Sequence, residues 1–515
     1  METESRREKV EDRPTSSLRP GFSVSSRAFW LVLAGLLAAT VAFPLTQFVM
    51  TGGHIYYLNG FDETAYLQYD YSRVIQGIAR PGQYLVTLLH QAGLAGGQIN
   101  LLLDLTMPLA FVLAARAVLR GLNWSVEQAN GGALALLVLP ELALSSNPLV
   151  HRFWAWTMQH GLRFWFNVPD MTSSPFWRSP EPQFSLLMLA LAIGLAVRIR
   201  RYWPVYFVLP FMYPFIALPA GFVLLACHTR SCWPWGERWA TAGPLLFAYA
   251  VLGALSWAYG AFFVGATTHL FLVPTHLPLF SLTGALMLTV YMALCRRSDA
   301  RWRFWGLALA LAPLAVSNHQ ILAGYIAQPI NFERYAGGVL FALMLVTATK
   351  LPARVWQVIF AFAMVLYLRD VVLSFRANQA VCAELPLTPA LLHDLRRDPD
   401  RVVVDDFVVS GELNMLYPRE GSTALGLEKA TAQFCDRYLD DYLRIRRQVR
   451  LDHPESRRLK YILAEMDDGF TYKGLDDPYI RIGRTPKPKP LDDLDARVAS
   501  EPALKLDYFF VRTSH

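Results

Sequence analysis

Long apolar runs alternate with short basic segments between residues 28 and 375. A helix needs about 20 mainly apolar residues to cross a bilayer. We predict helices of this kind at 28–50, 99–118, 131–146, 184–199, 240–263, 277–295, 304–317, 335–349 and 355–374. The pattern therefore predicts a polytopic α-helical membrane protein.

The stretch 202–228 is somewhat long for one helix and short for two, and it is interrupted by prolines, which break helices. Basic residues flank it on both sides, at 198–201 and at Arg230 and Arg238. Since cytoplasmic loops carry the excess of Lys and Arg, the chain must leave and return between these flanks. We predict two short helices broken around Pro210 to Pro219, which brings the total to about 11 spans.

The distribution of charge also predicts the orientation. Residues 1–27 are polar and mixed in charge, as in a disordered tail, and their Arg and Lys residues place the tail in the cytoplasm. No cleavable signal is evident after Arg27. An odd number of spans then puts the C-terminal segment outside, together with the loops 51–98, 147–183, 264–276 and 318–334. We expect a multi-pass protein of the cell (inner) membrane.

Residues 376–515 have a different pattern. Apolar runs at 401–407, 460–466 and 505–512 predict strands, and 427–450 predicts a charged amphipathic helix. Strands that alternate with helices indicate a small α/β domain, here on the extracytoplasmic side. Cys382 and Cys435 both lie in this segment, where they could form a disulfide or remain two buried thiols.

Composition agrees with a membrane protein, since 54% of residues are hydrophobic and only 17% are charged, against about 25% charged in an ordinary soluble domain. The histidines are scattered, and there is no HExxH or CxxC spacing and no phosphate-binding glycine motif. We therefore expect no metal centre and no nucleic-acid partner.

The first outer loop contains the stretch "DETAY" at 62–66, in which Asp62 and Glu63 are adjacent and Tyr66 follows. Acidic residues in a first helical turn favour the helix dipole and need no function. The position is nevertheless unusual, because the pair follows closely after the first span.

A cytoplasmic N-terminus, a first span and a large outer loop opening on an Asp-Glu pair resemble the GT-C superfamily of integral membrane glycosyltransferases. The resemblance covers the architecture of most of the chain, but only "DETAY" as a motif. It implies a polyprenyl-phosphate-linked sugar donor, an extracytoplasmic acceptor (glycan, lipid or protein) and an essential carboxylate in the first outer loop. Asp62 would be the general base, with Glu63 next. It implies no cofactor, and leaves open a divalent cation at Asp62 or Glu63.

Two further outer segments are dense in polar residues, "RSPEPQFS" at 178–185 and 317–335. Polar groups at the ends of spans tend to face a cavity. A sugar that leaves a polyprenyl phosphate needs cations or donors around the phosphate, and Arg178, His319 and Arg334 could supply them. Glu181, Gln183 and Gln328 could hold sugar hydroxyls, and Tyr66 and Gln320 are further candidate substrate contacts. The ordinary alternatives are snorkelling for Arg178, and a helix cap or an interhelical hydrogen bond for His319 and Gln320.

Two other functions stay open. Broken helices often line the substrate sites of transporters, so 202–228 would also suit a transporter or a flippase of a lipid-linked sugar. Against this, no inverted repeat is evident, and acids within spans are scarce, Asp104 and Glu141 being the main exceptions. A non-catalytic partner in membrane assembly is the third possibility.

Overall fold

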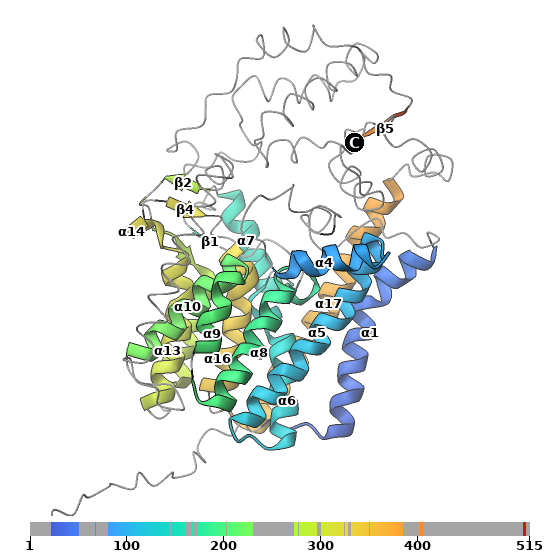
Figure 1. The fold of residues 1–515 in the computed structure, drawn as a ribbon. Helices are drawn as coiled ribbons and strands as arrows, with labels where there is room; N and C mark the ends of the chain where they lie inside the picture. The colour runs from blue at the N-terminus through green and yellow to red at the C-terminus, as the bar shows by residue number, and fades with distance from the viewer. Residues whose placement is uncertain are drawn as a thin grey trace, which may run out of the picture.

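The computed structural model describes most of the residues between 22 and 384 and two short pieces beyond. The ranges are 22–50, 81–144, 146–160, 174–201, 203–229, 278–295, 300–323, 331–349 and 351–384, with Leu67, 166–167, 272–274, His276, 325–327, 402–404 and 508–510. Within these ranges the chain forms a bundle of roughly parallel and antiparallel helices (Figure 1).

Eight helices overlap the predicted spans, with ends that differ from the predicted ones by up to ten residues. They are α1 (Ser26–Met50), α5 (Gly96–Gly121), α6 (Val126–Val138), α8 (Gln183–Ile199), α12 (Leu282–Val290), α13 (Ala300–Val316), α16 (Gly338–Ala348) and α17 (Ala353–Glu384). The predicted span 240–263 lies outside the described residues. Tight packing joins α5 to α6 and α8, and α13 to α12 and α16.

Shorter elements connect or extend these helices. They are α4 (Pro81–Gln91), η1 (Leu139–Ala143), α7 (Pro148–Gln159), η2 (Pro175–Trp177), α9 (Trp203–Val208), η3 (Leu209–Phe211), α10 (Pro214–Thr229), the π-helical η5 (Tyr291–Cys295) and η6 (Phe332–Gly337), and α14 (Gln320–Ala323). Two small sheets pair β1 (Phe166–Asn167) in parallel with β3 (Phe280–Ser281), and β2 (Leu272–Pro274) antiparallel with β4 (Tyr325–Ala327).

Three helical segments among the described residues are long and apolar enough to cross a membrane: Gly96–Gly121, Val126–Thr157 and Ala353–Ser374. Two shorter apolar helices, α1 and α8, pack beside these segments. The described part of the chain is therefore a helical bundle of the kind found in membranes.

The predicted break in 202–228 is present. α9 packs back along α8, and the helical path is interrupted at Met212 and Tyr213, after Pro210. The backbone N–H of Tyr213 donates to Ser185 Oγ over 2.7 Å. Because Ser185 is near the first residue of α8, the break is held at the end of the bundle where α8 begins.

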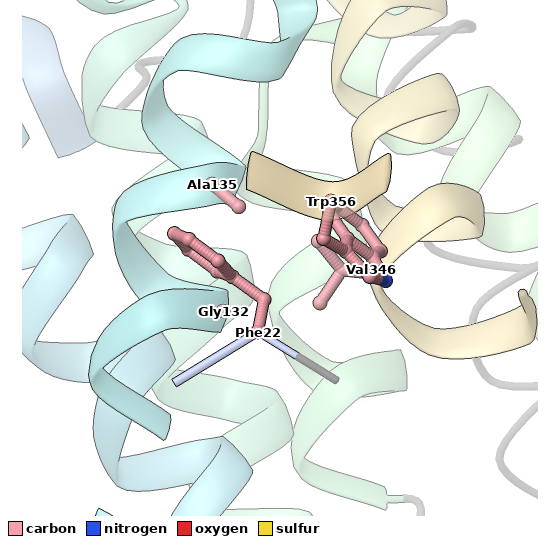
Figure 2. Close-up of a pocket in the computed structure, with 5 residues that line it drawn as sticks. All are labelled: Phe22, Gly132, Ala135, Val346 and Trp356. Atoms are coloured by element: carbon pink, nitrogen blue, oxygen red, sulfur yellow. The ribbon is translucent and has the colours of Figure 1, made fainter. Parts of the chain in front are cut away.

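Glycines allow the segment ahead of α1 to dock against α6. A Cβ on Gly131 would stand 2.7 Å from Phe22 Cδ1, and one on Gly132 would meet Leu119 Cδ1 at the same distance. Phe22 thereby reaches a small apolar pocket shared with Trp356, whose ring centroid lies 6.3 Å away (Figure 2). Phe22 forms one wall of this pocket, opposite Trp356.

The C-terminal prediction is covered only in part. β5 (Val402–Val404) and β6 (Tyr508–Phe510) lie within two of the three predicted strands, and they pair in parallel. The predicted strand 460–466 and helix 427–450 lie outside the described residues. The change of composition at residue 376 does not end a helix, since α17 continues to Glu384.

Candidate functional site

The structure describes six of the predicted substrate-contacting residues: Arg178, Glu181, Gln183, His319, Gln320 and Arg334. Asp62, Glu63, Tyr66 and Gln328 lie outside the described residues. Cys382 belongs to α17, but Cys435 is not described, so the predicted disulfide stays a prediction. The six described residues lie on the turn before α8, the turn after α13, and η6.

Arg178 and Arg334 converge on one aromatic ring, that of Tyr335. The Arg178 guanidinium carbon lies 4.6 Å from the ring centroid, and that of Arg334 lies 5.7 Å from it. Both distances are within the roughly 6 Å at which a cation is attracted to a ring. Arg178 is only 3% exposed and Tyr335 only 2%. Two arginines that are far apart in sequence therefore bring their charges to the same buried tyrosine.

Further aromatic rings surround this tyrosine. Tyr213 packs edge-on to Tyr335 with ring centroids 5.4 Å apart, and Phe215 lies between Tyr335 and Phe332. His319 packs edge-on to Phe332 at 5.9 Å. The broken helix, η6 and the turn after α13 thus share one aromatic cluster, which the two arginines border.

Glu181 extends this region toward α4 (Pro81–Gln91). Its Oε2 accepts a hydrogen bond from Ser185 Oγ at 2.6 Å, and Ser185 is the residue that holds Tyr213. A Cβ built on Gly82, in the first turn of α4, would stand 3.1 Å from Glu181 Oε1. In Figure 1, α4 lies across the end of the bundle where α8 begins. Its glycine lets the backbone of the first loop approach the Glu181 carboxyl group.

A second network holds the same turn from the other side. Asp104, fully buried on α5, accepts from Ser179 Oγ and from Gln183 Nε2 through Oδ1, both at 2.8 Å, and from Asn100 Nδ2 through Oδ2 at 3.3 Å. Gln183 Nε2 also donates to the Phe176 carbonyl at 2.7 Å. Ser179 and Gln183 therefore anchor the turn to α5, while Arg178 and Glu181 make their contacts elsewhere.

His319 and Gln320 lie in the turn that follows α13. His319 Nδ1 is 2.6 Å from the Val316 carbonyl, so the ring caps the end of the helix. Gln320 is buried, and its Nε2 lies 3.4 Å from Asn318 Oδ1, which also accepts from the backbone N–H of Leu279. The ordinary capping interpretation accounts for these bonds, although His319 also borders the aromatic cluster.

The sequence did not single out Tyr335 or Glu333. Glu333 is fully buried, and its carboxylate accepts from Ser281 Oγ and, over 3.1 Å, from the backbone N–H of Thr283. It thereby fixes η6 to the start of α12. An acid at the edge of an apolar run was the available signal, since such residues usually have a partner inside the bundle.

Within the described ranges, no group of three or more His, Cys, Asp or Glu side chains could hold a metal ion. Comparisons with known proteins give no lead to a family: no family model, no curated protein and no solved structure matches this chain. The functional interpretation therefore depends on the geometry of this site.

Proposed function

We propose that the chain is a membrane glycosyltransferase that moves a sugar from a polyprenyl-phosphate donor to an acceptor outside the cytoplasmic membrane. The observation that supports this most is the convergence of Arg178 and Arg334 on Tyr335 at the end of the bundle where α8 begins. The proposal includes a GT-C-like arrangement of about 11 spans, with the C-terminal α/β domain on the outer side.

The donor would meet a cationic and partly apolar site. Guanidinium groups bind phosphate through charge-assisted hydrogen bonds, and such bonds strengthen where water is excluded. Arg178 and Arg334 would hold the phosphate and stabilise its charge as it departs. The rings of Tyr213, Phe215 and Phe332 would border the lipid or the sugar.

The reaction would be a direct displacement. The acceptor oxygen attacks the anomeric carbon of the sugar, and the bond from that carbon to the phosphate oxygen breaks, with its electron pair leaving on the polyprenyl phosphate. Asp62 would take the proton of the acceptor hydroxyl, with Glu63 as the next candidate. Both acids precede α4 in the first outer loop, and the contact between Gly82 and Glu181 joins α4 to the turn of Arg178.

A transfer assay tests the role of Asp62. Asp62→Asn should lower the rate by about 10²–10⁴-fold, because that is what a positioned general base contributes. The measurement is sugar transfer by purified protein in lipid vesicles, over a panel of polyprenyl-phosphate sugars. Glu63→Gln tests the next candidate in the same way, Glu127→Gln at an exposed position is the control, and expression and membrane insertion are compared for all three. Full activity of Asp62→Asn would overturn this assignment.

A binding assay tests the two arginines separately from catalysis. A short-chain polyprenyl phosphate should bind the purified protein, and the same polyprenol without phosphate should bind more weakly. Arg178→Gln and Arg334→Gln should each weaken phosphate binding about tenfold or more, since a charged hydrogen bond contributes about 1.5–3 kcal/mol. Arg354→Gln, at an exposed position at the start of α17, is the matched control. Equal affinity in all three variants would contradict a phosphate site at Tyr335.

One observation favours a second candidate, a transporter or flippase of a lipid-linked sugar. The broken helix α9–α10 places Tyr213 beside Tyr335, and interrupted helices often line transport sites. Vesicles that carry a labelled lipid-linked sugar separate the two functions. Movement of the lipid between leaflets without a transfer product would favour the flippase, and a glycosylated acceptor would favour the transferase.

A further inference from the structure

A separate buried polar cluster lies where η1, η2 and α17 meet. It contains two acids from distant parts of the chain, Glu141 on η1 and Asp370 on α17, and both are 0% exposed. Glu141 Oε2 accepts from Ser146 Oγ at 2.5 Å. None of these residues belongs to the aromatic cluster around Tyr335.

Two serines link the surroundings of the acids. The backbone N–H of Ser174 donates to Asp370 Oδ2 over 3.1 Å. Ser146, which donates to Glu141, accepts through its carbonyl from Arg369, the residue beside Asp370. Because η1 packs against α17, both acids belong to one buried cluster, where two negative charges repel each other.

Each acid also has an oxygen that no donor reaches. Within the described residues, Glu141 Oε1 and Asp370 Oδ1 are buried and have no hydrogen-bond partner. Buried carboxylate oxygens without donors are costly, because water is lost and nothing replaces it. Asp104 offers the contrast, since both of its oxygens accept hydrogen bonds.

A count of charges shows what the cluster lacks. Arg369, beside Asp370 in the chain, is the one cation among the described residues of the cluster, and its Nη1 donates to the Ser146 carbonyl. Two ionised acids and one arginine leave a net negative charge inside the bundle. Burial of an unbalanced charge is unfavourable, and one proton on the acid pair restores neutrality.

We propose that Glu141 and Asp370 form a proton-binding site that holds a single shared proton in the folded bundle. Protonation of one acid removes one of the two negative charges and leaves the other balanced by Arg369. Two carboxyl groups that share a site take up and release protons as a pair.

The other groups that face the pair do not remove the need for this proton. On α17 they are Arg369 and Tyr367, whose hydroxyl lies 2.6 Å from Thr40 Oγ1 on α1 and accepts from Trp177 Nε1 at 2.9 Å. In the turn after η1 the described neighbours are hydroxyl and amide groups, Ser146 and Asn147. α6 and α16 also pack against η1. α16 carries no ionisable residue, and the one on α6 is Glu127, which is exposed.

Dicyclohexylcarbodiimide tests the proposal, because this apolar reagent enters membranes and reacts with protonated carboxyl groups. The purified protein is treated at pH 7, and the peptides containing residues 141 and 370 are analysed by mass spectrometry. We expect one adduct per chain at these two positions, on Glu141 or on Asp370. Absence of an adduct from both acids, or adducts on both acids of the same chain, would overturn the proposal.

Variants test whether the proton is shared. In Glu141→Gln the remaining acid, Asp370, is balanced by Arg369. Loss of a neighbouring like charge favours ionisation of Asp370. Because the reagent reacts with the protonated form, the amount of adduct on Asp370 should fall at least about tenfold. Asp370→Asn should do the same to Glu141. Undiminished labelling of the remaining acid would contradict sharing. If a variant does not fold, the number of adducts on the unaltered protein still tests whether the pair holds one proton.

A metal cation is the alternative occupant, and the same assay excludes or reveals it. Labelling at pH 7 should be equal in sodium, potassium and choline chloride at the same ionic strength. Suppression of the adduct by sodium or potassium alone would show that a metal ion occupies the site and would overturn a proton site.

Discussion

Asp104 and the pair of Glu141 with Asp370 are equally buried, but their surroundings differ. Asp104 accepts hydrogen bonds from three side chains, those of Ser179, Gln183 and Asn100. Glu141 and Asp370 each retain an oxygen without a donor among the described residues. Burial alone therefore does not tell what an intramembrane acid does.

The difference follows from what each acid fixes. Asp104 ties the turn before α8 to α5, so three donors are arranged around its two oxygens. The acid pair lies where η1 packs against α17, and two acids meet there with too few donors. We expect removal of Asp104 to harm the fold, and removal of one member of the pair to be tolerated.

The largest effect is expected for Asp104→Ala. The Asn100 amide would lose its acceptor, and Ser179 and Gln183 would each lose one of two acceptors. An unsatisfied buried group costs about 1–3 kcal/mol and the missing side chain leaves a cavity, so the free energy of unfolding should fall by about 3 kcal/mol. Denaturant unfolding of the detergent-solubilised protein measures this. Asp104→Asn, which keeps an oxygen for Ser179 and Gln183, should lose clearly less. Equal losses would show that the charge matters more than the hydrogen bonds.

A medium effect is expected for Tyr367→Phe, next to the acid pair. Without the hydroxyl, Trp177 Nε1 loses its acceptor inside the bundle, at a cost of about 1–3 kcal/mol. The same unfolding measurement applies. Tyr84→Phe is the control, because Tyr84 is 59% exposed and its loss of a hydroxyl should change nothing measurable. Similar stability of the two variants would mean that the bond between Trp177 and Tyr367 contributes little.

The smallest effect is expected for Asp370→Asn. The amide keeps an oxygen for the Ser174 N–H, adds a donor that can face Glu141, and removes one of two like charges. The free energy of unfolding should then change by less than about 1 kcal/mol, in either direction. A loss as large as that of Asp104→Ala would contradict the comparison, since it would mean that Asp370 is needed in its charged form.

The helices were largely predictable from the sequence. Apolar runs predicted the positions of eight helices, because a membrane-crossing helix must be apolar over a fixed length. The proline-rich stretch also predicted the break that the structure shows at Met212 and Tyr213. The residue at which α17 ends was not predictable from composition, since a helix can continue beyond its apolar part.

The side-chain contacts of the candidate site were harder to predict from the sequence than the helices. The sequence indicated Arg178 and Arg334 as outer residues, but their meeting on Tyr335 depends on how η6 packs against the turn before α8. Asp370 was missed for a similar reason. It follows Arg369 in a long apolar run, and adjacent opposite charges can be interpreted as a pair that needs no other partner. Its hydrogen-bond partner Ser174 is 196 residues away in the chain.

The docking of Phe22 has a practical consequence for protein engineering. The segment between Phe22 and α1 is bound to α6 by two hydrogen bonds, from Val24 N–H to the Glu127 carbonyl at 2.9 Å and from Asn130 Nδ2 to the Val24 carbonyl at 3.1 Å. A rigid fusion partner, of the kind used to enlarge small membrane proteins for electron microscopy, should therefore not be spliced onto α1 as one continuous helix. Such a splice would replace Phe22 and Val24 and empty the pocket between α6 and Trp356, whereas a junction ahead of Phe22 leaves these contacts intact.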